Sequence, residues 1–346
     1  MMHAAIGHAL RLLVALAAVV HVSAGSMAAG PGATPTGGPR VVRLDPRVDR
    51  LVPREAVMEK IADGFTWVEG PAWHRTGGYL FFSDIPRNTV FKWQPGTGVT
   101  RFLTPSGYTG TAPFLGREPG SNGLTFDPAG RLVLAEHGDR RIARLEADGR
   151  KTTLVDRYDG KRLNSPNDLV FARNGDLYFT DPPFGLPKAF DDPGKELPWS
   201  GVYRLSARGD LTLLTRHLRA PNGIALSPDE KTLYVSNADR DRAVWMAYDV
   251  RDDGILTHGR VFFDATAQAQ TMKGAPDGMK VDREGHLFAA GPGGVYILAP
   301  DGTLLGRLET GGVVSNVAWG HDGSVLYLTA DTAIYRIHLT TRGTGF

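Results

Sequence analysis

Six oxygen-bearing side chains recur at one position of a repeated motif. In each copy a polar turn leads into a short apolar run, as in the stretch 220–229, Ala-Pro-Asn-Gly-Ile-Ala-Leu-Ser-Pro-Asp. Successive copies are separated by about 40–55 residues, which is the length of one unit in several repeat folds. The side chains at the shared position are Glu69, Asn122, Asn167, Asn222, Asp277 and Asn316.

These six side chains offer only oxygen ligands, from two carboxylates and four carboxamides. Such a set suits Ca²⁺, and less well Mg²⁺ or Mn²⁺, whereas zinc usually prefers nitrogen or sulfur. Asn or Asp before Gly is also an ordinary turn residue, so each position taken alone can be structural. Glu69 has no turn preference, and a buried Glu is costly unless it is paired or metal-bound. The set as a whole therefore favours a cation site.

Short segments rich in β-forming residues follow each motif. Examples are 79–83, 131–135, 176–180, 232–236, 286–290 and 325–329, each preceded by a turn with Gly or Asp. A third strand follows in each unit, and further turns lead to fourth strands such as 304–308. Four strands in a repeat of this length predict an all-β fold, a six-bladed β-propeller of four-stranded blades. The six oxygen-bearing side chains would then form a ring at one mouth of the central channel.

The last unit is short and ends at the C-terminus. We expect a strand within residues 55–62 to supply its missing strand and close the ring. Two stretches interrupt the repeat, residues 104–120 and 182–200. Both are rich in Gly and Pro and long for hairpin loops, so they are candidate lids over a site.

The N-terminus has the features of a secretory signal. An apolar run at 12–22 follows Arg11 and precedes small residues that suit cleavage, although it can also be interpreted as an uncleaved anchor. We predict a signal peptide at 1–24, a flexible linker at 25–40 and a single propeller domain at 41–346. A secreted or periplasmic protein without stable membrane insertion is expected.

Composition excludes several kinds of partner and site. Lys plus Arg number 39 and Asp plus Glu 37, which gives a net charge of +2, and no basic cluster stands out. Nucleic acid is therefore not an expected partner. The chain has no cysteine, so disulfides, thiolate metal sites and cysteine nucleophiles are excluded.

Four segments in order resemble the SMP-30/gluconolactonase/LRE family. They are 68–73, 164–168, 220–229 and 276–279, and the resemblance covers about residues 65–336. The likeness to bacterial gluconolactonases is carried by 121–127 with 136–138, and by 178–186. It implies a six-bladed propeller with one catalytic divalent cation, Ca²⁺ first and Mg²⁺, Mn²⁺ or Zn²⁺ as alternatives. The family's ligand pattern falls on Glu69, Asn167, Asn222 and Asp277.

The resemblance also implies a reaction. The cation would polarise a lactone carbonyl for attack by water, with Asp277 as both ligand and general base. Asn122 is expected to line the substrate pocket. His137 is either a helper there or a hydrogen-bonded structural histidine. Ser165 stands where some family members carry an Arg that grips sugar hydroxyls, and it is assigned to substrate binding. Asp168, by strand alternation, is expected to point into its blade.

Three further functions stay open. The same metal site can serve phosphotriesters or aryl esters, since this fold hosts several hydrolytic activities. A non-catalytic propeller could bind a ligand with calcium in a structural role. A strictosidine-synthase-like protein is the third. A serine triad is not expected, because no Gly-x-Ser-x-Gly elbow is present.

Overall fold

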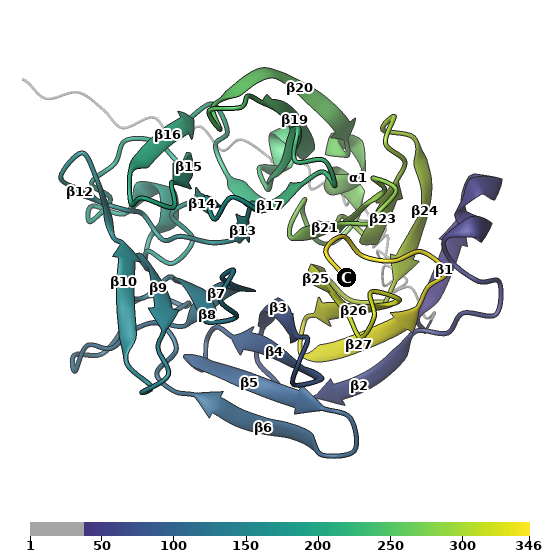
Figure 1. Cartoon of the computed structure of the whole chain (residues 1–346), viewed down its shortest axis with the longest axis horizontal. Helices are drawn as coiled ribbons and strands as arrows, with labels where there is room; N and C mark the ends of the chain where they lie inside the picture. The colour runs from purple at the N-terminus through teal and green to yellow at the C-terminus, as the bar shows by residue number, and fades with distance from the viewer. Residues whose placement is uncertain (1–37) are drawn as a thin grey trace, which may run out of the picture. The chain divides into compact units, whose positions relative to one another are not determined.

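Residues 38–346 are described by a computed structural model, which arranges six antiparallel sheets in a ring (Figure 1). Each sheet begins at the ring's axis, and its following strands step outward. The predicted six-bladed propeller of four-stranded blades is confirmed. The first three blades are β3 (Val68–His74), β4 (Tyr79–Asp84), β5 (Thr89–Gln94) and β6 (Gly98–Leu103); β7 (Ser121–Phe126), β8 (Leu132–Glu136), β9 (Arg141–Leu145) and β10 (Lys151–Val155); and β13 (Leu169–Phe171), β14 (Leu177–Asp181), β15 (Gly201–Leu205) and β16 (Leu211–Thr215).

The remaining three blades include strands from both ends of the chain. The fourth is β17 (Pro221–Leu226), β18 (Thr232–Asn237), β19 (Val244–Val250) and β20 (Leu256–Asp264). The fifth is β21 (Met279–Val281), β22 (Leu287–Gly291), β23 (Gly294–Leu298) and β24 (Leu304–Glu309), with β1 (Arg40–Arg43) added at its outer edge. The sixth is β25 (Val314–Gly320), β26 (Val325–Ala330) and β27 (Ala333–His338), completed by β2 (Glu59–Asp63).

The pairing of β2 with β27 closes the ring, as predicted from the short last repeat. The strand β1 on the fifth blade was not predicted; it begins at Arg40, the last residue of the expected linker. Outside the blades lie a small hairpin and four short helices: β11 (Arg157–Tyr158) with β12 (Lys161–Arg162), η1 (Pro46–Arg50), η2 (Ala189–Asp191), η3 (Arg240–Arg242) and α1 (Thr266–Thr271).

Glycines after the repeated oxygen-bearing residues let neighbouring blades approach closely. A Cβ on Gly123 would lie 2.6 Å from the backbone oxygen of Asn167, and one on Gly223 would lie 2.3 Å from that of Asp277. Both distances are shorter than real Cβ atoms tolerate. Neither glycine has a positive φ. These glycines therefore allow close packing at the ring's axis, for which a positive φ is not required.

Hydrogen bonds between adjacent blades hold the backbone at the repeated oxygen-bearing residues. The Ser83 hydroxyl donates to the backbone oxygen of Asn122 (2.9 Å), and the Thr180 hydroxyl donates to that of Asn222 (2.6 Å). The Gly123 amide donates to the backbone oxygen of Asn167 (2.7 Å). The backbones of the repeated residues are thus held by the fold, while their side chains stay available for other contacts.

Apolar side chains fill the interfaces between adjacent blades. Between the fourth and fifth blades, for example, Trp245 and Tyr234 pack with Met279, Leu287 and Tyr296. Trp245 and Tyr296 are both fully buried, and their rings lie 5.1 Å apart. Such burial removes large apolar surfaces from water and holds the blades at fixed angles around the axis.

Two long stretches without strands connect elements of the first three blades. The first insertion (residues 104–120) joins β6 to β7, and the second insertion (residues 182–200) joins β14 to β15. A Cβ on Gly116 would lie 3.3 Å from the backbone oxygen of Gly185, so the two insertions touch. They correspond to the interruptions seen in the sequence.

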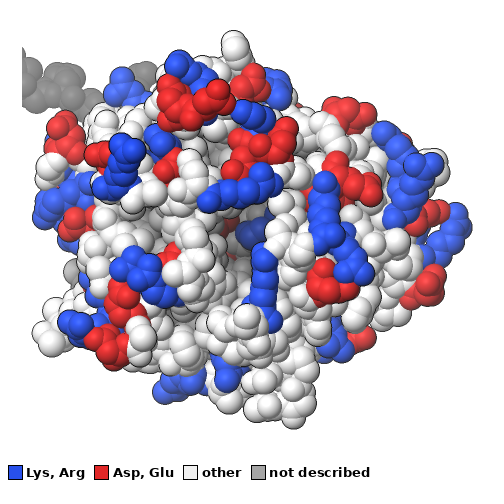
Figure 2. Space-filling view, viewed as in Figure 1, with Lys and Arg blue, Asp and Glu red and all other residues white. Residues whose placement is uncertain are grey.

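The predicted signal peptide (1–24) and nearly all of the predicted linker lie outside the described residues. Within residues 38–346 no helix is long and apolar enough to cross a membrane. Figure 2 shows Lys and Arg interspersed with Asp and Glu around a central hollow on the face drawn, with no large area of a single sign. That mixture agrees with the net charge of +2.

Candidate metal centre and active site

The six repeated side chains all lie at the axial ends of their blades. Four of them lie within the first two or three residues of inner strands, and the other two, Asn167 and Asp277, come two residues before one. Asp277 is partly exposed, whereas the other five are only 2–7% exposed. The structure therefore gathers six polar side chains at the axis and buries five of them, and buried polar groups need hydrogen-bond partners or a ligand.

The two carboxylates of this ring repel each other. Burial, followed by the charge of Asp168, raises the pKa of Glu69 to about 8. Burial, followed by the charges of Glu69 and Asp168, raises the pKa of Asp277 well above its usual range. Each carboxylate accepts one backbone N–H, Glu69 from Gly70 at 3.0 Å and Asp277 from Gly278 at 2.9 Å. Carboxylates in this situation must share protons or a cation.

Asp168 faces the axis, which corrects the expectation that it points into its blade. Its Oδ2 lies 3.5 Å from Nδ2 of Asn316, which belongs to the blade on the opposite side of the ring. Strand alternation does not apply, because β13 begins only at Leu169, whose amide donates to Asp168 Oδ1 (2.9 Å). A signal was present in the sequence: Asp168 occupies the position that four other repeats fill with Gly.

Asn122 holds an unpartnered oxygen. Its side chain is 4% exposed, and Oδ1 has no hydrogen-bond donor among the described residues. A buried amide oxygen without a donor costs free energy unless a cation or a ligand hydroxyl meets it. This orphaned atom and the crowded carboxylates both fit an oxygen-only cation site with a substrate pocket beside it.

The carboxylates alone do not provide enough ligands for a cation. Across residues 38–346, no three His, Cys, Asp or Glu side chains come close enough together to hold a metal ion. Any cation here would need amide oxygens as well, which is ordinary for Ca²⁺. The donor set therefore fits a hard cation with mixed carboxylate and amide ligands, and it fits zinc poorly.

The sequence profile of the SMP-30/gluconolactonase/LRE-like region matches residues 67–332. The chain belongs to this family. It is 41% identical to a gluconolactonase of Zymomonas mobilis subsp. mobilis over 310 residues, 88% of this chain and 87% of the relative. It is 27% identical to a pentonolactonase of Haloferax volcanii, over 75% of this chain and 80% of that protein.

A solved structure of the family shows the same fold. The gluconolactonase of Xanthomonas campestris is 35% identical and superposes with a TM-score of 0.76, covering 88% of this chain and 96% of that one. The resemblance inferred from the sequence motifs is thus confirmed at the level of family and fold.

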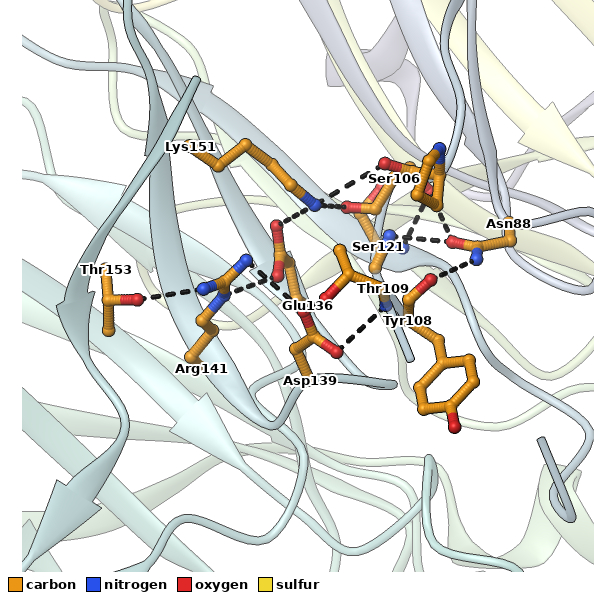
Figure 3. Close-up of polar contacts among 12 residues, drawn as sticks. Asn88, Ser106, Tyr108, Thr109, Ser121, Glu136, Asp139, Arg141, Lys151 and Thr153 are labelled. Carbon is orange, nitrogen blue, oxygen red and sulfur yellow. Dashed lines mark hydrogen bonds and ion pairs between the residues drawn. The ribbon is translucent and has the colours of Figure 1, made fainter. Parts of the chain in front are cut away.

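In this family member the first insertion is tied to the second blade by charged groups (Figure 3). The fully buried Glu136 pairs with Lys151 at 2.7 Å, and Lys151 donates to the backbone oxygen of Ser106 at 3.1 Å. Further along, the Thr109 amide donates to Asp139 (3.0 Å). Burial raises the pKa of Glu136 against the opposing effect of Lys151. The insertion is therefore anchored at its base to the second blade.

Ser165 supports the second insertion. Its hydroxyl donates to the backbone oxygen of Pro182 (2.6 Å) and accepts from the Gly185 amide (2.9 Å). The residue is fully buried. Its only proton is donated within the protein, so Ser165 has a structural role here, and the substrate contact predicted for it stays a prediction.

His137 lies beside Asn167 at the ring, its predicted contact with substrate stays a prediction, and its partner Glu118 was missed. The imidazole is fully buried, with Nε2 3.5 Å from Nδ2 of Asn167 and Nδ1 2.7 Å from Oε2 of Glu118. Glu118 belongs to the first insertion, which has no counterpart in the other repeats. The spacing of the repeats therefore could not predict where Glu118 lies.

Proposed function

We propose that the protein is a lactonase that uses one divalent cation, Ca²⁺ first, to hydrolyse a sugar lactone or a related lactone. The observation that carries the proposal is the pair of carboxylates at the axis, Glu69 and Asp277, with the orphaned oxygen of Asn122 at the same end of the blades. Its relatives named gluconolactonase and pentonolactonase support the substrate class.

The residues that would hold the cation are Glu69, Asn167, Asn222 and Asp277. When bound, a divalent cation supplies the positive charge that polarises a lactone carbonyl and offsets the carboxylates. Their two negative charges and two amide oxygens match the ligands that Ca²⁺ takes in proteins. Glu69, almost completely buried, would serve as a pure charge ligand.

Asp277 is the group that we assign to proton transfer. It is the more exposed of the two carboxylates, so water can reach it. Water adds to the carbonyl carbon while Asp277 takes its proton; the ring C–O bond then breaks, and Asp277 returns the proton to the leaving oxygen, giving the hydroxy acid. Asn122 would accept a hydrogen bond from a substrate hydroxyl at its free Oδ1, and the two insertions would limit access of bulk water.

The test is a substrate panel on chelator-treated protein, with hydrolysis followed by a pH indicator and corrected for the spontaneous reaction. Glucono-δ-lactone, a γ-lactone, an aryl ester and a phosphotriester are each measured without metal and with Ca²⁺, Mg²⁺, Mn²⁺ or Zn²⁺. We expect lactone hydrolysis that chelator abolishes and Ca²⁺ restores. Faster turnover of the ester or the phosphotriester would overturn the substrate class. Cation binding without hydrolysis would favour the non-catalytic alternative.

A further inference from the structure

A buried histidine connects the first insertion to one of the proposed cation ligands. His137 follows β8 directly and is fully enclosed. One ring nitrogen, Nδ1, lies 2.7 Å from Oε2 of Glu118, and the other, Nε2, lies 3.5 Å from Nδ2 of Asn167. Nδ1 has no aligned hydrogen bond within residues 38–346, so the Glu118 contact is close but off the ideal direction. Misaligned hydrogen bonds are common in sites that await a ligand.

Glu118 determines which groups donate and which accept in the hydrogen bonds that join Glu118, His137 and Asn167. An ionised carboxylate can only accept, so Glu118 requires the proton of a neutral imidazole to sit on Nδ1. Nε2 is then an acceptor, and it can only receive a hydrogen bond from the NH₂ of Asn167. Because an amide has its NH₂ and its oxygen on opposite sides, Oδ1 of Asn167 must then point away from His137.

We propose that Glu118 and His137 form a positioning pair that fixes this orientation of Asn167 and so directs its Oδ1 to the axis of the ring. The inference rests on the proposed function, in which Asn167 is a ligand. Before a cation binds, an amide side chain can take either orientation unless a neighbouring group distinguishes its NH₂ from its oxygen. A histidine with a defined tautomer supplies that distinction. Residues that orient metal ligands in this way typically contribute 10–100-fold to metal affinity.

Both insertions hold the pair in place. Glu118 lies close to the anchored end of the first insertion, where the backbone oxygen of Pro119 accepts from the Tyr108 amide (2.6 Å). Gly185 of the second insertion also packs against His137, so closely that a Cβ there would lie 2.6 Å from Cβ of His137. The two insertions thus position a ligand in addition to covering the site.

The tautomer of His137 is the first test, and it needs no bound metal. Nitrogen-15 chemical shifts of histidine-labelled, metal-free protein separate the two neutral tautomers, and His137→Phe assigns the signal among the ten histidines. We expect the Nδ1–H form. An Nε2–H form would make that nitrogen a donor, which would turn Oδ1 of Asn167 toward His137 and overturn the proposal.

Cation affinity in matched variants is the second test. Glu118→Gln keeps an acceptor for Nδ1–H, so Ca²⁺ affinity measured by calorimetry should stay within about threefold. Glu118→Ala and His137→Phe should each weaken it by about tenfold or more. Equal losses in Glu118→Gln and Glu118→Ala would show that Glu118 acts through its charge instead of by positioning.

Thr109→Val is the control for a general loosening of the insertion. It removes the hydroxyl that donates to Asp139 (2.7 Å) at the insertion's base and leaves the pair intact. We expect unchanged Ca²⁺ affinity; a loss equal to that of Glu118→Ala would overturn the positioning role. If wild-type protein binds no cation, the proposed function fails, while the tautomer measurement still decides whether Glu118 and His137 orient Asn167.

Discussion

Carboxylates at the two ends of the inner strands behave in opposite ways. At the hairpin end, the Ser324 hydroxyl and the backbone N–H of the same residue lower the pKa of Asp322 to about 2. There, too, the Ser227 hydroxyl and the Lys231 amide lower the pKa of Asp229. At the axial end, burial raises the pKa of Glu69 to about 8. The negative charge of a carboxylate is therefore stabilised at the hairpin end and destabilised at the axial end.

The difference separates structural from functional use of one residue type. Turn carboxylates accept nearby backbone N–H groups and stay in contact with water, so their charge is stabilised locally. The axial carboxylates accept one backbone N–H each and lie within reach of other negative charges. A fold retains such an arrangement where a ligand completes it. Substitutions at the two ends should therefore have opposite signatures.

The largest effect is expected for Asp277→Asn. The amide keeps an oxygen at the ring but can no longer take a proton from water. Lactone turnover should fall by about 10²-fold or more and stay low at saturating Ca²⁺. A return to near-wild-type turnover at high Ca²⁺ would mean that Asp277 is only a ligand.

Asn222→Ala is the matched comparison for that variant. It removes a neutral oxygen and leaves the assigned base in place. The expected result is a higher Ca²⁺ requirement with turnover that partly recovers as Ca²⁺ is raised. If both variants respond to Ca²⁺ in the same way across the titration, the division of roles between ligand and base is wrong.

The pH dependence of stability should differ between the ends of the strands. The pKa of Glu69 is raised from 4.5 to about 8, so the folded, metal-free protein holds a proton that the unfolded chain releases. Stability from this group is complete below pH 4.5 and is lost as the pH rises toward 8, by on the order of 5 kcal/mol in total. Urea unfolding of wild type and Glu69→Gln in chelator at pH 5, 6.5 and 8 measures the difference.

Asp322→Asn provides the control for that series. The lowered pKa of Asp322 means that its contribution is present above the usual 3.8 and is lost only as the pH falls toward 2. Between pH 5 and 8 this variant should keep the wild-type slope. A Glu69→Gln protein with the same slope as wild type would show that Glu69 is not held in its protonated form.

A smaller effect is expected from the glycines. Gly223→Ala would place a Cβ 2.3 Å from the Asp277 backbone, so the blades must separate, and we expect a loss of about 1–2 kcal/mol. At the hairpin end, a Cβ on Gly285 meets nothing closer than 3.4 Å. Gly285→Ala should cost only the strain of its positive φ, roughly 1 kcal/mol. Equal shifts of the two urea midpoints would remove the distinction between the ends.

The sequence predicted the repeat features and missed the irregular ones. The ring of six blades and its closure by β2 follow from periodicity and a short last unit, both of which are local signals. Asp168 was misplaced because alternation was applied before its strand begins. The partnership of Glu118 with His137 joins an unrepeated loop to a blade. Contacts of that kind depend on three-dimensional packing and produce no regular spacing in the sequence.

Calorimetric titration of Ca²⁺ into chelator-treated protein tests the central claim most directly. The account predicts one cation per chain for wild type, a loss of binding by about 10²-fold or more in Glu69→Gln, and unchanged binding in Asp322→Asn. Wild-type protein that takes up no cation, or a Glu69→Gln protein that binds Ca²⁺ as well as wild type, would contradict it.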